Sequence, residues 1–267
     1  MPALAKDESQ RNHQYIVFLN PRRWPSLGFG FLKCISRFVF WSIFGSFLVA
    51  SAARKLTNRV NEISDIDEAV KFVFSFRYLG ITIVPSQIPD EITALLRLLA
   101  TTRPEVVLEI GTACGGTLFL LTWAASPSAS IISLDLPPGF FSGGYPKQKS
   151  LLYRSFARNK QNVCLIRADS HNPSTIEAVR EATNGQEIDV LFIDGDHSYE
   201  GVKKDFEMYS PLVKKGGIIA FHDISPGPNA KVGGVPVLWN EIEHRYRSLR
   251  IAKDCGEEGF GIGVLFV

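Results

Sequence analysis

The chain has 267 residues, of which 45% are hydrophobic and 21% are charged, and its formal net charge at pH 7 is +2. This composition supplies enough apolar residues for a core and excludes a disordered chain, while the small net charge gives no general argument for nucleic-acid binding. The four cysteines are far apart and form no C-x-x-C pair. That spacing excludes a disulfide framework and indicates reduced thiols in a cytosolic protein.

The N-terminal part differs from the rest in composition. Residues 1–27 are polar and basic, whereas residues 38–53 carry no charge and predict a hydrophobic helix with basic residues on both sides. A helix of that length spans roughly 24 Å, which is shorter than the hydrocarbon core of a bilayer, roughly 30 Å. We therefore divide the chain into an N-terminal extension, residues 1–60, and a folded domain, residues 61–267.

Three interpretations of residues 38–53 stay open. The segment is a short membrane anchor or in-plane helix, a helix packed on the domain or on a second subunit, or the lining of an apolar substrate site. The working hypothesis is association with a membrane surface on the cytoplasmic face, because the basic flanks suit anionic lipids.

Helices and strands alternate along the body of the chain. A helix is predicted over residues 89–101, where isoleucine and leucine recur on one face. Apolar runs predict strands near residues 105–110, 130–135, 162–167, 188–193 and 216–221, with helices between them near residues 116–125, 147–160, 173–183 and 199–213. This alternation is typical of a parallel sheet covered by helices on both faces.

The C-terminal part departs from that alternation. A helix is predicted near residues 235–246, and two strand-like runs follow it at residues 249–252 and 261–267. Glycines between the two runs favour a hairpin. We therefore expect the sheet to end in an antiparallel strand.

A buried strand, a glycine turn and a helix start follow one another around Gly111. Gly111, Gly115 and Gly116 would let the backbone approach a ligand where a Cβ atom would collide, and the amides of the following helix point to the same place. Glu109 would repel a pyrophosphate but suits a cationic amino-acid ligand. Asp135 ends the next apolar run, where an acid can bind ribose hydroxyls.

Acidic and imidazole side chains gather at the ends of two later strands. Asp194 and Asp196 are two residues apart, so in extended backbone they face the same side. His222 and Asp223 end the next parallel strand and are expected nearby. Carboxylates suit Mg²⁺, and a histidine favours Mn²⁺, Fe²⁺ or Zn²⁺ without excluding Mg²⁺. Alternatively, Asp196 and Ser198 cap the following helix, and Asp223 caps a turn.

Together these motifs resemble class I S-adenosylmethionine-dependent methyltransferases. The runs I-D-G-D-H-S-Y-E-G-V (residues 193–202) and K-G-G-I-I-A-F-H-D (residues 215–223) are similar to the subgroup of cephalosporin hydroxylase-like and rhamnosyl O-methyltransferase-like proteins. The similarity covers roughly residues 80–267. It implies an α/β, Rossmann-like methyltransferase sandwich, with a mostly parallel seven-stranded sheet and a C-terminal antiparallel strand, preceded here by an N-terminal hydrophobic helix.

The resemblance also implies roles for individual residues. S-adenosyl-L-methionine would be bound by Glu109, Gly111, Thr112, Gly115, Gly116, Asp135, Asp169, Ser170 and Asp194. Asp194, His222 and Asp223 would hold Mg²⁺ or another divalent cation, although relatives often carry an acid in place of His222. Asp196 stands where sugar methyltransferases place a general base, with His197 as the alternative catalytic residue.

The expected activity is S-adenosylmethionine-dependent O-methylation of a sugar, glycolipid or small-metabolite hydroxyl, assisted by a divalent metal. Two alternatives stay open: a metal-dependent hydroxylase of the cephalosporin hydroxylase-like type, and a non-catalytic S-adenosylmethionine-binding membrane adaptor. We expect a cytoplasmic protein whose partners are a small-molecule or glycan acceptor, with no nucleic acid. A membrane surface met through residues 38–53 and a homo-oligomer are further open alternatives.

Overall fold

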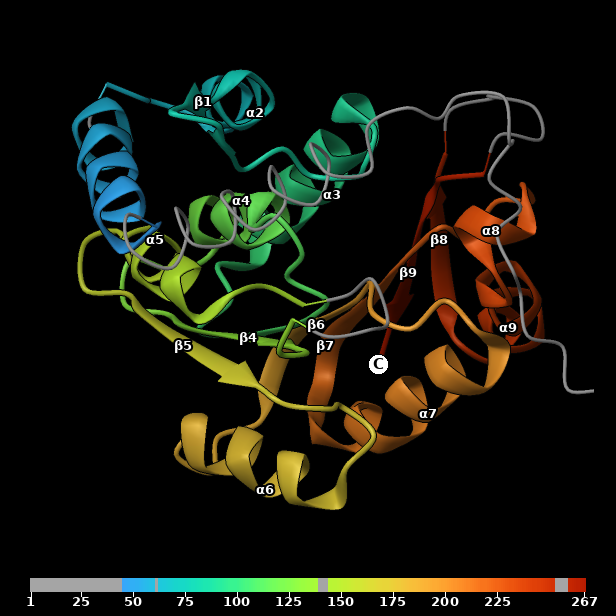
Figure 1. Ribbon diagram of the computed structural model, residues 1–267. Helices are drawn as coiled ribbons and strands as arrows, with labels where there is room; N and C mark the ends of the chain where they lie inside the picture. Colours follow the sequence, from blue (N-terminus) through green and yellow to red (C-terminus); the bar gives the residue numbers. More distant parts are fainter. Residues whose placement is uncertain (1–44, 61, 139–143, 253–258) are drawn as a thin grey trace, which may run out of the picture. The chain divides into compact units, whose positions relative to one another are not determined.

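The centre of the protein is a seven-stranded sheet with the strand order β5-β4-β3-β6-β7-β9-β8 (Figure 1). The computed structural model describes residues 45–60, 62–138, 144–252 and 259–267. The chain divides into two units, of which Met1–Ile43 lies outside the described residues and Phe44–Val267 contains all of them.

The strands confirm the sheet that the sequence predicts. The five parallel strands are β3 (Val106–Ile110), β4 (Ser130–Asp135), β5 (Asn162–Arg167), β6 (Ile188–Ile193) and β7 (Val213–His222). Antiparallel pairing then adds β9 (Ile262–Phe266) to β7, and β8 (Arg247–Ile251) to β9. The side chains of β3 are buried at every position, which explains why that strand reads as an unbroken apolar run.

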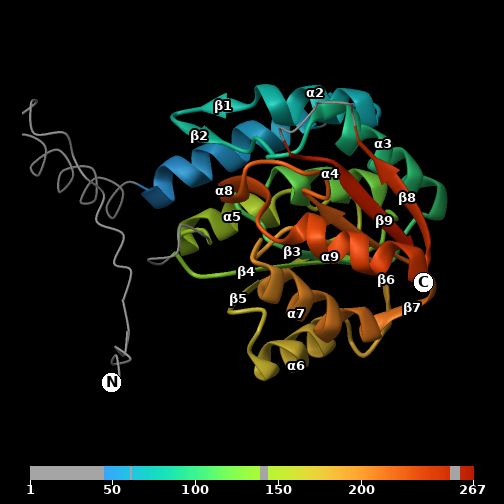
Figure 2. The same cartoon turned by 90° about the vertical axis from the view of Figure 1, so that its right-hand side faces the viewer.

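Helices cover both faces of the sheet (Figures 1 and 2). One face carries α3 (Pro89–Thr102), α4 (Gly116–Ala124) and α5 (Ser150–Arg154), and the other carries α6 (Pro173–Ala182), α7 (Tyr199–Tyr209) and α9 (Val235–Ile242). The residues of α4 are all buried, because that helix also packs against α3 and α2 (Ile66–Ser75). The fold is therefore the predicted α/β sandwich.

Several short elements differ from the sequence-based prediction. The helix expected over residues 147–160 is only a 3-10 turn, Lys147–Lys149, followed by α5. The helix α2 and the hairpin of β1 (Arg77–Tyr78) and β2 (Ile81–Thr82) were not anticipated. Side-chain hydrogen bonds fix the start of α2: the carboxylate of the N-cap residue, Asp65, accepts from the Glu68 amide at 2.9 Å, and the Glu68 carboxylate accepts from the Ser64 amide at 2.8 Å.

The part of the apolar N-terminal segment that the structure describes is a helix over residues 45–60. Its buried side chains include Val49, Ala52 and Leu56, which recur at helical spacing. The Ser51 hydroxyl lies 3.1 Å from the Tyr78 hydroxyl of β1, so the helix contacts the body of the protein. Among the described residues, no helix is long and apolar enough to cross a membrane. Residues 38–44 of the predicted segment lie outside the described residues.

Candidate functional site

A cavity of about 760 Å³ lies at the carboxyl ends of the parallel strands. Open parallel sheets bind ligands at that edge, and the volume is in the range of small-molecule sites. It is lined by most of the residues that the sequence singles out: Gly111, Asp135, Asp169, Ser170, Asp194, Asp196, His197, His222 and Asp223. Glu109, Thr112, Gly115 and Gly116 do not line it.

The glycine turn between β3 and α4 is shaped by the protein's own atoms. Gly111 has a φ of +98°, and a Cβ atom there would lie 2.0 Å from the Asp194 carbonyl oxygen. A Cβ at Gly115 would meet the Tyr153 ring at 2.5 Å, and one at Gly116 would meet the Ile83 carbonyl oxygen at 2.4 Å. The sequence-based explanation, approach to a ligand, is therefore incomplete. The three glycines allow close packing of neighbouring segments, and only Gly111 also faces the cavity.

Glu109 is fully buried beneath this turn. One carboxylate oxygen accepts a hydrogen bond from the Ser133 hydroxyl at 2.7 Å, and the Ser133 and Thr112 hydroxyls are also hydrogen-bonded to each other. The other oxygen, Oε1, is buried without a hydrogen-bond partner among the described residues. Burial raises the pKa of Glu109 well above its ordinary value. An unpartnered buried oxygen retains the capacity to accept from a cationic group that enters the site.

Asp135 closes the same turn from the end of β4. Its Oδ2 accepts from the amides of Thr112 and Ala113, at 3.1 and 2.8 Å, and its Oδ1 accepts from the Leu136 amide at 2.7 Å. Burial nevertheless raises the pKa of Asp135, despite these hydrogen bonds. The carboxylate therefore lines the cavity in a fixed orientation, in which it can accept hydrogen bonds from neutral hydroxyl groups.

The loop that follows β5 forms another part of the cavity wall. The Asp169 carboxylate accepts from the His171 amide at 2.8 Å, and the Asp169 carbonyl accepts from the Thr175 hydroxyl at 2.7 Å. The Ser170 carbonyl accepts from the Tyr209 hydroxyl of α7 at 2.8 Å. Two helices below the sheet thus hold the backbone on which Asp169 and Ser170 stand.

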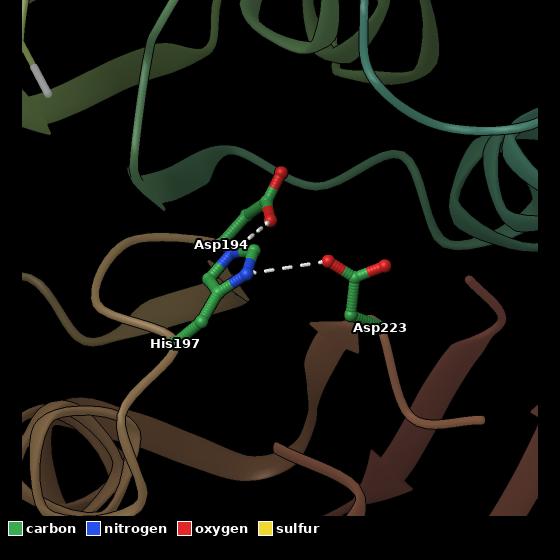
Figure 3. A group of neighbouring side chains, drawn as sticks. All are labelled: Asp194, His197 and Asp223. Atoms are coloured by element: carbon green, nitrogen blue, oxygen red, sulfur yellow. Dashed lines mark hydrogen bonds and ion pairs between the residues drawn. The ribbon is translucent and has the colours of Figure 1, made fainter. Parts of the chain in front are cut away.

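A cluster of carboxylates and imidazoles lies at the ends of β6 and β7. Asp194, His197 and Asp223 have potential ligand atoms within 4.8 Å of one another. The His197 ring lies between the two carboxylates (Figure 3), with Nε2 at 3.2 Å from Asp194 Oδ1 and Nδ1 at 3.4 Å from Asp223 Oδ2. His222 Nδ1 contacts the same two oxygens at 3.1 and 3.3 Å. The structure thus brings together the residues expected to hold a metal and adds His197 to them.

The charges of this cluster are strongly coupled. Burial would lower the pKa of His222, but the charge and hydrogen bonds of Asp194 and Asp223 raise it to about 10. The hydrogen bond to Asp194 raises the pKa of His197 to about 9. Burial opposes ionisation of Asp194, yet the neighbouring imidazoles hold its pKa below the ordinary value. Without a metal, the two histidines supply the positive charge that balances the carboxylates.

His197 is held from both sides by the segment that follows β7. Its Nδ1 lies 2.6 Å from the Lys231 carbonyl oxygen, and its own carbonyl accepts from the Gly234 amide at 2.7 Å. A Cβ atom at Gly233 would lie 2.0 Å from the His197 carbonyl oxygen. These contacts fix the imidazole at the cavity wall, with Nδ1 turned towards a backbone acceptor.

Asp196 serves the start of α7 as well as facing the cavity. Its Oδ1 accepts from the Ser198 amide at 2.8 Å, and the Ser198 hydroxyl accepts from the Gly201 amide at 3.0 Å. Ser198 is the N-cap residue of α7. The capping alternative thus holds for Ser198, while Asp196 is an exposed residue that orders the turn before the cap.

Gln87 is a site residue that the sequence analysis missed. It is buried, and its amide Nε2 donates to Asp194 Oδ2 at 2.7 Å, while its Oε1 accepts from the Thr117 hydroxyl at 2.8 Å. It therefore ties Asp194 to the start of α4. Its place in the run Q-I-P-D-E (residues 87–91), where α3 begins, was the available signal.

Comparisons with known proteins match the part of the chain that forms most of the cavity. Residues 108–224 match the family described as a methyltransferase domain, and that range runs from the strand before the glycine turn to the residue after Asp223. An uncharacterized protein of Acanthamoeba polyphaga mimivirus is 35% identical over 116 residues, which cover 43% of this chain and 50% of that protein. An uncharacterized protein of Sinorhizobium fredii is 26% identical over 172 residues, 63% of this chain and 18% of that protein. The chain thus spans half or less of these relatives' lengths.

Solved structures are similar to this chain at low sequence identity. A putative caffeoyl-CoA O-methyltransferase from Staphylococcus aureus has a TM-score of 0.50 and 18% identity, covering 81% of this chain and 99% of that one. An O-methyltransferase from Bacillus cereus, in complex with S-adenosylhomocysteine, has a TM-score of 0.49 and 16% identity, with 80% and 97% covered.

Proposed function

Because the chain has a Rossmann-like α/β fold and residues 108–224 match the family described as a methyltransferase domain, we propose that it transfers a methyl group from S-adenosylmethionine to a hydroxyl oxygen. One observation carries the proposal. A single cavity contains both the amide-held carboxylate of Asp135 and the cluster of Asp194, His197 and Asp223. The first suits the ribose of a methyl donor, and the second suits activation of an acceptor.

The donor occupies the glycine-turn side of the cavity in this proposal. Asp135 accepts from the ribose hydroxyls, and Asp169 and Ser170 lie beside the adenine ring. Glu109 acts from below the turn: its unpartnered Oε1 is available to the ammonium group of the methionine part. Gly115 and Gly116 contribute by letting the turn pack tightly, and Thr112 by presenting its amide to Asp135.

The donor set at the other side fits a divalent cation. Asp194 and Asp223 supply carboxylate oxygens, and His222 supplies an imidazole from beneath them. Carboxylates with an imidazole favour Mn²⁺, Fe²⁺ or Zn²⁺ over Mg²⁺, without excluding Mg²⁺. A cation bound there would lower the pKa of a hydroxyl group beside it. Gln87 orients Asp194 through the hydrogen bond to Oδ2, which leaves Oδ1 facing the imidazoles.

His197 is the proposed general base. Nδ1–H donates to the Lys231 carbonyl, and without a cation Nε2–H donates to Asp194. A cation that takes over the Asp194 charge would lower the pKa of His197 and free Nε2 to accept a proton. The acceptor oxygen attacks the methyl carbon as the carbon–sulfur bond breaks, and the sulfur leaves with the electron pair as S-adenosylhomocysteine. The proton of the hydroxyl passes to His197. Holding donor and acceptor in line supplies much of the rate. Asp196 is the alternative base.

A sugar, glycolipid or small-metabolite hydroxyl is the proposed acceptor class, and association of residues 38–53 with a membrane surface would suit a glycolipid. The domain division at residue 60, a cytoplasmic location and a homo-oligomer belong to the same proposal. A hydroxylase or a non-catalytic adaptor is the competing interpretation. A hydroxylase would consume an oxidant and leave S-adenosylmethionine intact, and an adaptor would bind it without turnover.

Calorimetry on the full chain tests the proposal. We expect binding of S-adenosylmethionine and S-adenosylhomocysteine, and separate binding of Mn²⁺ or Mg²⁺ that is lost in Asp223→Ala. In Asp135→Ala we expect donor binding to weaken while cation binding persists. Lipid and glycan extracts from cells with and without the protein are then compared by mass spectrometry. The expected product is heavier than its acceptor by one methylene unit. If the wild-type protein binds neither S-adenosylmethionine nor S-adenosylhomocysteine, the proposal is wrong.

A further inference from the structure

Exposed apolar side chains stand on three surface segments on one side of the protein. Phe47, near the start of the helix over residues 45–60, is 71% exposed; Leu79, in the turn between β1 and β2, is 55% exposed; Leu151 of α5 is 53% exposed. The start of that helix, the β1–β2 turn and α5 all lie at the left of Figure 2, and β8 lies on the opposite side of the protein in both views. Three apolar side chains therefore reach the solvent from the same side.

The same three segments carry charge of only one sign. Residues 45–60, 77–82 and 144–154 contain no aspartate or glutamate. Their basic residues are Arg54, Lys55, Arg59, Arg77, Lys147, Lys149 and Arg154. The whole chain has 29 basic and 27 acidic residues, so its composition does not account for this one-sided charge. Among the described residues, only Arg59 of this set forms an ion pair, with Glu62 at 3.3 Å. We call the surface of these three segments the basic face.

The β1–β2 turn presents its leucine from an unfavourable backbone conformation. Leu79 has a φ of +49°, in the left-handed region, and Gly80 follows with a φ of +77°. Asn, Asp or Gly usually occupy such positions in a hairpin turn, and a leucine there is an outlier. The Tyr78 hydroxyl lies 3.1 Å from the Ser51 hydroxyl, which ties the hairpin to the helix one turn after Phe47. An exposed leucine in a strained turn stabilises neither the core nor the turn, which indicates a partner outside the chain.

The basic face borders the mouth of the cavity. From the end of β2 the chain reaches Ser86 within four residues, and Ser86 is an exposed residue of the cavity lining. Gly144, at the start of the third segment, and Leu136, which is 36% exposed, also line the cavity. A Cβ atom built on Gly144 would lie 2.2 Å from the Leu136 carbonyl oxygen, so these two parts of the rim are in contact. A molecule that enters the cavity past this rim passes beside the basic face.

We propose that the basic face docks on a bilayer of anionic lipids and that the acceptor hydroxyl belongs to a lipid of that bilayer. Phe47, Leu79 and Leu151 enter the boundary between headgroups and acyl chains, while the lysines and arginines pair with lipid phosphates. Because the cavity opens beside this face, a lipid headgroup reaches it without leaving the bilayer. The choice of acceptor rests on the proposed function, whereas the docking stands independently of it.

An anionic bilayer fits this face better than the other classes of partner. A nucleic acid would use the positive charge but would leave the exposed apolar side chains without contacts. A second copy of the chain, docked through the same face, would bring one positive surface against another. A bilayer accommodates both the charge and the apolar side chains. The uncharged run of residues 38–53 also leads into the helix that carries Phe47.

Vesicle binding by the full chain tests the docking. Sedimentation measures the affinity for phosphatidylcholine vesicles with and without phosphatidylserine, and hydrogen exchange shows which segments the lipid covers. We expect binding that requires phosphatidylserine and weakens as salt is added. Amide exchange should slow in residues 77–86 and 144–154 and stay unchanged in α9 and β8.

Paired substitutions then locate the contact. Leu79→Glu combined with Leu151→Glu should lower the affinity by about 10-fold or more, because two apolar side chains are lost from the lipid and two negative charges face it. Val237→Glu combined with Leu249→Glu is the matched control: it changes two exposed apolar residues, on α9 and β8, in the same way. The control should keep the wild-type affinity, and the melting temperature of each variant is measured alongside.

The outcomes separate the docking from the proposed function. If the wild-type chain does not bind anionic vesicles, or binds them with unchanged exchange in residues 77–86 and 144–154, the docking is overturned. A dimer that Leu79→Glu dissociates, without vesicle binding, would assign the face to a second copy instead. Calorimetry with S-adenosylhomocysteine on the same samples tests the proposed function: vesicle binding without cofactor binding rejects that function and keeps the docking.

The acceptor is tested with S-adenosylmethionine that is labelled in its methyl carbon and with a cell extract separated into lipid and water-soluble fractions. We expect the label in the lipid fraction. Label in the water-soluble fraction alone would overturn the assignment of a lipid acceptor while leaving methyl transfer in place.

Discussion

Asp135 and Asp194 stand at the same edge of one sheet, yet their surroundings move their pKa values in opposite directions. Asp135 accepts from backbone amides alone, and burial raises its pKa. Burial would also raise the pKa of Asp194, but two imidazoles outweigh that effect and lower it. The comparison shows that the partner group, more than burial, sets the charge of a carboxylate in this cavity.

The difference separates the two halves of the site by chemistry. An amide-held carboxylate carries little compensating charge, so it suits neutral donors such as hydroxyl groups. A carboxylate held by imidazoles stands where positive charge is already gathered, and a divalent cation can replace protons there. The Asp135 side of the cavity therefore suits hydrogen bonding to neutral groups, and the Asp194 side suits the binding of a cation.

The largest expected effect comes from Asp194→Asn, which removes the charge on which the second half depends. Both imidazoles lose their main partner, so the pKa values of His197 and His222 should fall from about 9 and about 10. Methyl transfer should decrease by about 100-fold or more, in the range expected for the loss of general-base catalysis. Proton NMR of the imidazole resonances across pH, together with a turnover assay, measures both effects.

Asp189→Asn is the matched control for this change, because its carboxylate pairs with Lys214 away from the cavity lining. Its substitution should leave the imidazole resonances in place. Unchanged histidine titration in Asp194→Asn would contradict the electrostatic comparison.

Gly111→Ala should act on both halves at once, since Gly111 touches the backbone of Asp194. The new Cβ would lie 2.0 Å from the Asp194 carbonyl oxygen, at a φ of +98° that side chains rarely adopt. Overpacking and backbone strain together should lower the free energy of unfolding by about 2–5 kcal/mol. Urea unfolding measures the loss. Gly185→Ala, which also has a positive φ but nothing within 4 Å, isolates the strain and should lose less.

The fold and the place of the site could be predicted from the sequence, and the reasons are physical. Apolar runs between helical periods leave few arrangements other than a parallel sheet, and the carboxyl ends of neighbouring strands meet at one edge. The register of β6 with β7 pairs Ile193 with Phe221. Asp194 and His222, the next residues along each strand, were therefore bound to be neighbours.

The side-chain partners could not be predicted, because they join segments that no local pattern connects. Gln87 reaches Asp194 from 107 positions away, and the Lys231 carbonyl reaches His197 from a four-residue helix, α8 (Asn229–Val232). The actual neighbours of Gly115 and Gly116 likewise depend on how distant segments pack. The residues of a turn indicate where the chain changes direction, but they do not indicate which distant segments pack against that turn.

The pH dependence of stability sharpens the comparison by a smaller effect. In the folded state, the pKa values of His197 and His222 are about 9 and about 10, against an ordinary value of 6.5. Their stabilising contribution is thus complete below pH 6.5 and is lost as pH rises through the folded-state values. Without a cation, the melting temperature should fall between pH 7 and 10. Asp194→Asn should show a shallower fall, and saturating Mn²⁺ should oppose it, because metal binding strengthens as ligands lose protons.

The smallest effect is expected from Asp196→Asn, and it decides between the two candidate bases. Asp196 is exposed, and the amide oxygen of asparagine can keep the hydrogen bond that its carboxylate accepts from the Ser198 amide. Stability should therefore change by less than about 0.5 kcal/mol, as for most surface substitutions. If His197 is the base, methyl transfer in Asp196→Asn should stay within about twofold of the wild-type rate, whereas His197→Gln should lose about 100-fold. A large loss in Asp196→Asn, with the His197 resonances unmoved, would transfer the role of base to Asp196.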